Sequence, residues 1–149
     1  MLYLEDLKIG DEFKSRSYHM TEEEILQFAK KFDPQPFHTD AQQAQKHPIF
    51  KGLAASGWHT AAVVMRLWSE CFPIAYGLVG TDSHVRWPCP TRPDDEIRVI
   101  VTITDIKPSQ RKPVRGIVRY ETQALNQKDQ VLFNSTTNIL VFKREFTAV

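Results

Sequence analysis

The sequence has little excess charge of either sign and no long uninterrupted apolar run. Its 149 residues carry 19 Lys and Arg against 18 Asp and Glu, so the surface lacks the strong positive field with which proteins bind nucleic acid. The longest apolar stretch, from Leu53 to Trp68, is interrupted by Ser56, His59, Thr60 and Arg66. It is too polar for a membrane span and predicts a buried helix. We therefore expect neither a nucleic-acid partner nor a membrane.

Cysteine is scarce, and no signal peptide is expected from the first residues. Cys71 and Cys89 lie in unlike surroundings without metal-ligand spacing, which is typical of two reduced thiols. Residues 1–8 lack the basic start and apolar core of a signal peptide. The expected location is the cytoplasm. The length suits a single domain over residues 1–149, because the chain shows no repeat, linker or low-complexity segment.

Helical signals fill the first half of the chain. Thr21 with Glu22–Glu24 forms a capping box, and the apolar residues that follow share one face, so we predict a helix over residues 22–31. A second capping box, at residues 39–42, predicts a short helix that ends near His47–Pro48. Residues 32–38 should form a constrained loop between the two. Residues 53–72 are apolar nearly all round, which predicts a central helix enclosed by other structure.

The second half of the chain shows the alternation of β-strands. Residues 97–104 and 118–124 alternate apolar with polar side chains, residues 80–87 and 131–143 are rich in β-formers, and residues 11–18 offer an edge strand. Polar or proline-rich turns join these strands, which predicts an antiparallel meander. An apolar helix before such a sheet must be covered by it, so the fold class is α+β with the sheet wrapped around a long central helix, the hot-dog layout. One sheet leaves an edge and a helix flank uncovered, so we expect a homodimer or a higher homo-oligomer.

Asp33 and His38 are the strongest candidates for chemistry. Pro34 and Pro36 restrict the backbone between them, so both side chains should be held with little conformational freedom. Together an imidazole and a carboxyl group can orient a water molecule, with the imidazole taking a proton and a carboxylic acid returning one. That division requires the site to raise the carboxyl pKa from its usual value of about 3.9. The alternative is structural: Asp33 ends one helix and His38 begins the next.

Three further positions lie at the start of the central helix. Gly52 permits close approach, and free N–H groups with the helix dipole suit a developing negative oxygen, although Gly52 can equally be a loop residue. His59 reads as a core histidine, and Thr60 is open to either role. A metal site made from Asp33, His38 and His59 lacks recognisable ligand spacing, so no metal is expected.

The run from Phe32 to Ala44 resembles the signature of the MaoC-like dehydratases and R-specific enoyl-CoA hydratases. That signature is Asp, any residue, Asn, Pro, any residue, His, and later a small residue, and here it reads Asp33, Pro34, Gln35, Pro36, Phe37, His38 and Ala44. Residues 52–59 and 85–95 are similar to the family's central-helix start and strand-ending turn. Gln35 stands where the signature has Asn, and Asp94 where the turn usually has Gly, at a position where Asp tolerates φ > 0.

The resemblance implies reversible hydration of a trans-2-enoyl thioester. Asp33 and His38 would be the catalytic pair, Gly52 the donor to the thioester oxygen, and Thr60 and Gln35 supporting residues of the substrate site. The substrate would be an acyl-CoA or acyl-carrier-protein thioester, and no cofactor is implied beyond coenzyme A as part of that substrate. Phe37, Trp58 and residues near Trp87 are candidates for the acyl pocket.

Two other functions remain open. A hot-dog thioesterase would share the fold and the thioester but would not need the Asp33–His38 loop. A non-catalytic acyl-thioester binding module would need the fold without the chemistry, since folds do not fix functions. Basic residues that could meet coenzyme A phosphates are scattered and read as solvated surface: Lys51, Arg86, Arg92, Arg111 and Lys112.

Overall fold

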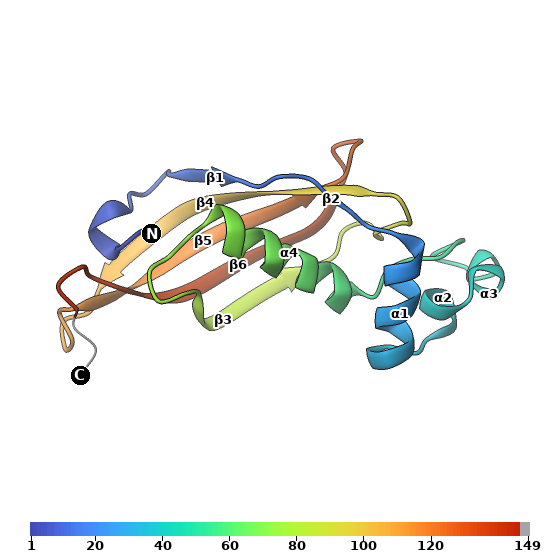
Figure 1. The fold of residues 1–149 in the computed structure, drawn as a ribbon, viewed down its shortest axis with the longest axis horizontal. Helices are drawn as coiled ribbons and strands as arrows, with labels where there is room; N and C mark the ends of the chain where they lie inside the picture. The colour runs from blue at the N-terminus through green and yellow to red at the C-terminus, as the bar shows by residue number, and fades with distance from the viewer. Residues whose placement is uncertain (147–149) are drawn as a thin grey trace.

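The order of helices and strands follows the change of pattern along the sequence. The computed structural model describes residues 1–146. The elements are η1 (Leu4–Asp6), β1 (Glu12–Lys14), β2 (Tyr18–His19), α1 (Glu22–Phe32), α2 (Pro36–Thr39), α3 (Ala41–Gln45), α4 (Gly57–Cys71), β3 (Val79–Arg86), β4 (Glu96–Pro108), β5 (Arg115–Leu125) and β6 (Val131–Phe142). Figure 1 shows α4 lying along one face of the sheet, with α1, α2 and α3 grouped beyond one end of it.

The sheet is antiparallel and runs in the order β1-β4-β5-β6-β3, with β2 pairing with β4. The hairpins β4-β5-β6 match the expected meander, but the expectation that β3 would join it beside β4 is wrong, because β3 pairs with β6. The physical cause lies in residues 88–95, which include three prolines. Proline cannot donate to a strand ladder, so this segment leaves the sheet and takes the chain from β3 to β4. Asp94 in this segment adopts φ 68°, as the sequence suggested it could.

The central helix begins at Gly57, four residues after the expected start at Leu53. Residues 54 and 55 make their backbone hydrogen bonds outside the helix. The Ala54 N–H donates to Phe37 O at 3.2 Å and the Ala55 N–H to Thr91 O at 2.9 Å. These bonds keep the segment in a non-helical strap, residues 50–56, that joins α2 to the β3–β4 connection. The apolar pattern could not reveal this, since small apolar residues suit a helix and a buried strap alike.

The core lies between α4 and the inner face of the sheet. Along β5 and the middle of β4 and β6, every second side chain is buried. Trp68 of α4 packs edge-on against Tyr120 at 5.4 Å and donates from Nε1 to Thr122 Oγ1 at 3.0 Å. The α+β class and the hot-dog fold are therefore confirmed. Within residues 1–146, the structure contains no helix with the length and apolar character needed to cross a membrane.

The helices before the strap bring the candidate residues together. α1 begins at the expected capping box, in which the Glu24 N–H donates to Thr21 Oγ1 at 3.2 Å, and it ends at Asp33. The predicted loop at 32–38 is partly wrong, because Pro36 starts the one-turn helix α2 that contains His38. Asp40, and not Thr39, caps α3, since Thr39 already belongs to α2. Pro36 at the first position favours the turn of α2, because proline has no N–H to leave unpaired there.

Candidate active site

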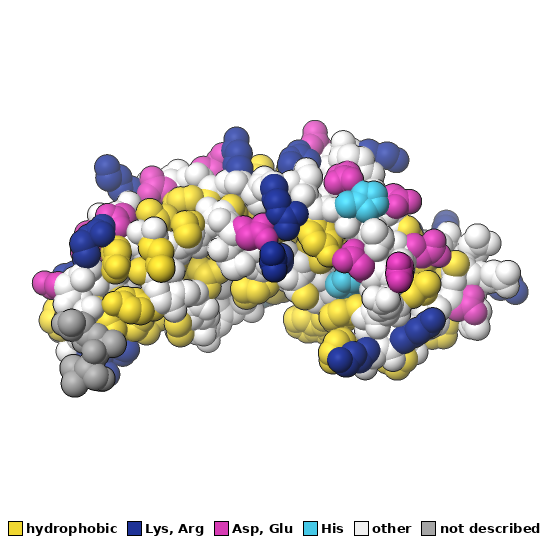
Figure 2. Space-filling model, in the orientation of Figure 1, with side chains coloured by type: hydrophobic (Ala, Val, Ile, Leu, Met, Phe, Trp, Pro, Cys, Tyr) yellow, Lys and Arg dark blue, Asp and Glu magenta, His cyan; other side chains and the backbone are white. Residues whose placement is uncertain are grey.

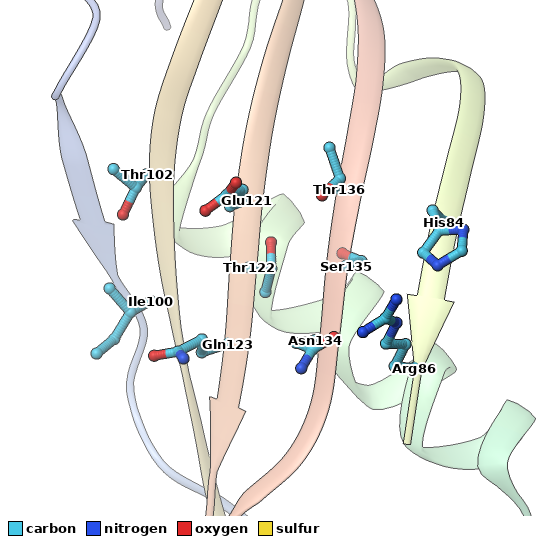
Figure 3. A pocket seen from close by; sticks show the side chains of 10 residues that line it. All are labelled: His84, Arg86, Ile100, Thr102, Glu121, Thr122, Gln123, Asn134, Ser135 and Thr136. Carbon is cyan, nitrogen blue, oxygen red and sulfur yellow. The ribbon is translucent and has the colours of Figure 1, made fainter. Parts of the chain in front are cut away.

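Two hollows of similar size, about 520 Å³ each, lie in different parts of the molecule. Figure 3 shows the first, on the sheet face turned away from α4. It is lined mainly by polar side chains from four strands, including His84, Arg86, Glu121 and Gln123. Among the described residues, none of these four makes a hydrogen bond or ion pair with another side chain of the hollow. This hollow has polar character but no assembled acid and base.

The second hollow lies where α1 and α2 meet the start of α4. Its lining is mostly apolar and aromatic, with a few polar groups: Asp33, Gln35, Phe37, His38, Ile49, Phe50, Ala55, Gly57, Trp58, Thr60, Trp87, Pro88, Cys89, Pro90 and Thr91. An apolar cavity with a few converging polar groups is the usual form of a small-molecule site. We take this hollow as the candidate active site.

Asp33 and His38 face each other within it. Asp33 Oδ2 lies 3.4 Å from His38 Nε2. The His38 ring is 5% exposed, and its other nitrogen, Nδ1, lies 2.6 Å from Ala54 O. A carbonyl can only accept, so Nδ1 carries the proton and in the neutral ring Nε2 presents its lone pair to the hollow. The strap thus fixes both the orientation and the tautomer of His38.

The charge state of Asp33 differs from the sequence expectation. Burial acts to raise the pKa of Asp33, but the nearby Ser56 hydroxyl, the hydrogen bond from Gln35 and the charge of His38 act in the opposite direction and prevail, so that the pKa lies below its usual value. The condition under which Asp33 could start as the acid, a raised carboxyl pKa, is therefore not met. At neutral pH Asp33 is a carboxylate, able to accept a proton and not to deliver one from the start.

Gln35 and Thr60 both line the hollow. Gln35 Nε2 donates to Asp33 Oδ1 at 2.6 Å, which leaves Oδ2 to face His38. Thr60 is buried, and its hydroxyl donates to Thr91 Oγ1 at 2.8 Å. Gln35 is therefore in contact with the candidate acid–base pair, and Thr60 lines the hollow from α4 and contacts Thr91.

Gly52 lies in the strap and not among the lining residues. Its carbonyl accepts from Arg92 Nη1 at 2.8 Å, and a Cβ added to it would stand 3.3 Å from that atom. The expected placement of Gly52 at the helix N-terminus is wrong, because α4 begins five residues later. The N–H groups at that terminus belong to Gly57 and Trp58, which line the hollow and make no hydrogen bond to another described residue.

His59 and the basic residues lie apart from the pair. His59 is 7% exposed and stacks on Phe28 of α1 with ring centroids 4.6 Å apart, and burial lowers its pKa. It is a core histidine, as the sequence suggested. Arg92 is occupied by the carbonyls of the strap, donating to Phe50, Gly52 and Leu53. Within residues 1–146 no three His, Cys, Asp or Glu side chains converge as a metal site.

Phe37, Trp58 and the residues near Trp87, which were expected to form a pocket, line the hollow, and so does Trp87 itself. Trp87 packs flat on Gly57, where an added Cβ would meet its ring at 2.9 Å, and it donates from Nε1 to Gly57 O at 2.8 Å. Trp58 meets Trp87 edge-on at 5.1 Å, and Phe37 stacks on Phe50 at 4.7 Å. Glycine at position 57 is therefore required for this wall to close.

Comparison with known proteins identifies the family. Residues 6–125 match the sequence model of one protein family, the MaoC like domain. The chain belongs to the MaoC-like family. A MaoC-like dehydratase from Rhodospirillum rubrum is 46% identical, with a TM-score of 0.95 over 98% of this chain and 100% of that chain. The uncharacterized protein YdeM of Bacillus subtilis (strain 168) is 34% identical over 142 residues, 93% of this chain and 97% of that protein.

Solved hydratases share the MaoC-like fold at lower identity. The R-hydratase PhaJ1 from Pseudomonas aeruginosa is 21% identical, with a TM-score of 0.74 over 99% of this chain and 92% of that chain. At this identity the likeness concerns the fold alone.

The sequence did not reveal the groups that lie next to Asp33 and His38. Ala54 holds His38 through its backbone carbonyl, and Ser56 contributes a buried hydroxyl near Asp33. A backbone acceptor leaves no signature in the sequence. The sequence identifies Arg92 only as a basic residue, because its contact with the strap joins positions about 40 residues apart.

Proposed function

We propose that the protein adds water reversibly to a trans-2-enoyl thioester and so produces a 3-hydroxyacyl thioester. The observation that carries the proposal is the Asp33 carboxylate held 3.4 Å from a histidine nitrogen whose tautomer is fixed by Ala54, in the wall of an apolar hollow. Two solved structures of similar fold are R-hydratases, one of them, from A. caviae, involved in PHA biosynthesis. Membership of the MaoC-like family supports hydratase or dehydratase chemistry in general.

The pair is suited to hold one water molecule. Neutral His38 presents the Nε2 lone pair and ionised Asp33 presents Oδ2, so both groups accept hydrogen bonds. A water molecule between them can donate one O–H to each. Its oxygen lone pair is then directed away from both acceptors and toward a substrate in the hollow.

The proposed reaction transfers one proton from water to His38 and then from the pair to the substrate. As the water oxygen forms a bond to C3, its proton moves to His38 Nε2, and the C2=C3 electron pair shifts toward the thioester oxygen. The neighbouring Asp33 carboxylate stabilises the imidazolium, and the pair returns one proton to C2. Dehydration is the same path reversed. Because Asp33 starts ionised, it supplies no proton of its own.

The thioester oxygen needs donors as negative charge builds on it. The resemblance assigned this role to the Gly52 N–H, and we keep it as one proposal. The unpaired N–H groups of Gly57 and Trp58 are the second, supported by their place in the lining and at the positive end of α4. The Thr60 hydroxyl lies in the same wall.

The substrate carrier is proposed to be coenzyme A or an acyl carrier protein. The aromatic lining from Phe37, Trp58 and Trp87 suits an acyl group. The expected cytoplasmic location stays a prediction.

The test is to mix the purified protein with crotonyl-CoA and with longer and branched enoyl-CoAs, and to follow the loss of enoyl-thioester absorbance. We expect wild type to form the 3-hydroxyacyl product, and Asp33→Asn and His38→Ala to lose about 10²-fold or more of the rate, since each removes an acid–base group. Asp105→Asn and His84→Ala, which change the same residue types in the sheet, serve as matched controls with wild-type rates.

Other outcomes point to the competing functions. Release of free coenzyme A thiol without a hydrated product would indicate a thioesterase. Tight binding of the enoyl-CoAs without any turnover would indicate a binding module. Wild-type rates in Asp33→Asn and His38→Ala would remove the pair from the mechanism.

A further inference from the structure

The Ser56 hydroxyl is a buried polar group that the chemistry above does not use. Ser56 is 0% exposed, and its Oγ makes no regular hydrogen bond to another described residue. It occupies the N-cap of α4, where a serine hydroxyl normally accepts from an N–H of the first turn, yet its side chain caps nothing. A hydroxyl buried without a partner is costly to keep and calls for an explanation.

The backbone fixes where this hydroxyl lies. The Ser56 carbonyl accepts from the His59 N–H at 3.0 Å and the Thr60 N–H at 3.1 Å, which ties the residue to the first turn of α4. Two residues earlier, Ala54 holds His38, and the flanking residues Ala55 and Gly57 both line the hollow. Ser56 therefore has little freedom to move away from the acid–base pair.

The Asp33 carboxylate is the acceptor that the surroundings of Ser56 offer, because Asp33 lines the same hollow as Ala55 and Gly57, the residues on either side of Ser56. One of its oxygens takes the Gln35 amide at 2.6 Å and the other faces His38, and each still has a lone pair to offer. The Ser56 hydroxyl lies near enough to help hold the pKa of Asp33 below its usual value. Its geometry falls short of a full hydrogen bond, as is common for catalytic groups before substrate binds.

We propose that Ser56 is a positioning residue, whose hydroxyl donates to the Asp33 carboxylate when the hollow is occupied and holds Oδ2 toward His38. The role depends on the hydratase function proposed above. Because the hydroxyl is shielded from solvent, it acts through Asp33 and does not touch the substrate.

The test compares Ser56→Ala and Ser56→Thr with wild type by two measurements. In the free protein, a carbon-13 NMR titration of the Asp33 carboxyl should show a higher pKa in Ser56→Ala and a value close to wild type in Ser56→Thr, which keeps the hydroxyl. His38, whose Nε2 faces Asp33, is followed in the same titration. In the hydration assay, Ser56→Ala should lose about tenfold in kcat with KM within about twofold, because the effect falls on the reacting pair.

Ser69→Ala is the matched control, since Ser69 lies on the same helix and its exposed hydroxyl donates only to Arg66 O at 2.7 Å. If Ser56 merely fills space, Ser56→Ala leaves the Asp33 titration and kcat unchanged, and the proposal is overturned. If wild type hydrates no enoyl thioester while Ser56→Ala still raises the pKa of Asp33, the contact with Asp33 stands and the hydratase function fails.

Discussion

At the scale of residues, the candidate site depends on how the two oxygens of Asp33 are shared. Gln35 takes Oδ1 and His38 faces Oδ2, while Ala54 fixes the other side of the histidine ring. The glutamine, which departs from the family signature, thus contacts the carboxylate directly. Its longer side chain spans from the N-cap of α2 back to the C-cap of α1.

Replacing Gln35 by Leu should raise the pKa of Asp33. The hydrogen bond favours the ionised carboxyl, so its contribution to the free energy of unfolding is present above the unfolded pKa of about 3.9 and is lost as pH falls through the lower folded pKa. We expect Gln35→Leu to destabilise the protein by about 0.5–1.5 kcal/mol at pH 7 and by less near pH 3. Urea unfolding at both pH values measures this.

Gln27→Leu is the control for that experiment. Gln27 also donates its amide to a carboxylate, Glu23 at 3.3 Å, but on the exposed face of α1. It should leave the Asp33 titration unchanged. An equal pKa of Asp33 in Gln35→Leu and wild type would show that the bond to Oδ1 has no influence on ionisation.

At the scale of elements, two short helical segments and one strap position the site. Asp33 ends α1, His38 lies in the single turn of α2, and the strap of residues 50–56 closes over both. Arg92 anchors the strap by donating to three of its carbonyls. The position of the Asp33 carboxylate in the site therefore depends on the last turn of α1 being helical.

The capping box of α1 should contribute measurably to stability. In Thr21→Ala the Glu24 N–H loses its side-chain acceptor at 3.2 Å, so we expect the free energy of unfolding to fall by about 1 kcal/mol. Thr21→Ser, which keeps the hydroxyl, should stay near wild type. Because Asp33 lies at the far end of α1, the rate at which the Thr21→Ala variant hydrates an enoyl-CoA at 25 °C should equal that of wild type while the protein remains folded. Equal stability of Thr21→Ala and wild type in urea would contradict the prediction.

At the scale of the whole molecule, one edge of the sheet remains uncovered. β3 is exposed along nearly its whole length, and beside it lie exposed apolar side chains, among them Met65 at 47% and Val79 at 45%. Figure 2 shows hydrophobic patches on the side of the molecule that carries α4, with charged side chains of both signs between them. Such an edge is usually covered by another chain in solution.

We therefore predict a dimer of twice the 17.2 kDa chain mass, measured by light scattering after size-exclusion chromatography. Met65→Lys should shift the population toward monomer, since it places a charge where the partner would pack. Ile9→Lys makes the same kind of change at a residue that is 64% exposed and precedes β1, at the opposite edge of the sheet. It should remain a dimer. A monomeric wild type would contradict the expectation.

The sequence by itself determined what depends on local pattern. It located α1 through a capping box, the strands through alternation, and the proximity of Asp33 and His38 through a spacer of four residues with two prolines. These features follow from interactions between residues close in the chain. The hot-dog fold followed because an apolar helix needs a sheet to cover it.

Only the tertiary structure decided what depends on distant partners. The start of α4 was set by hydrogen bonds from the strap to Phe37 and Thr91, and the pairing of β3 with β6 by a proline-rich segment that leaves the sheet. The ionisation of Asp33 was set by Ser56, Gln35 and His38 together, against the effect of burial. A pKa is a balance of desolvation against nearby charges and donors, and that balance exists only once the chain has brought them together.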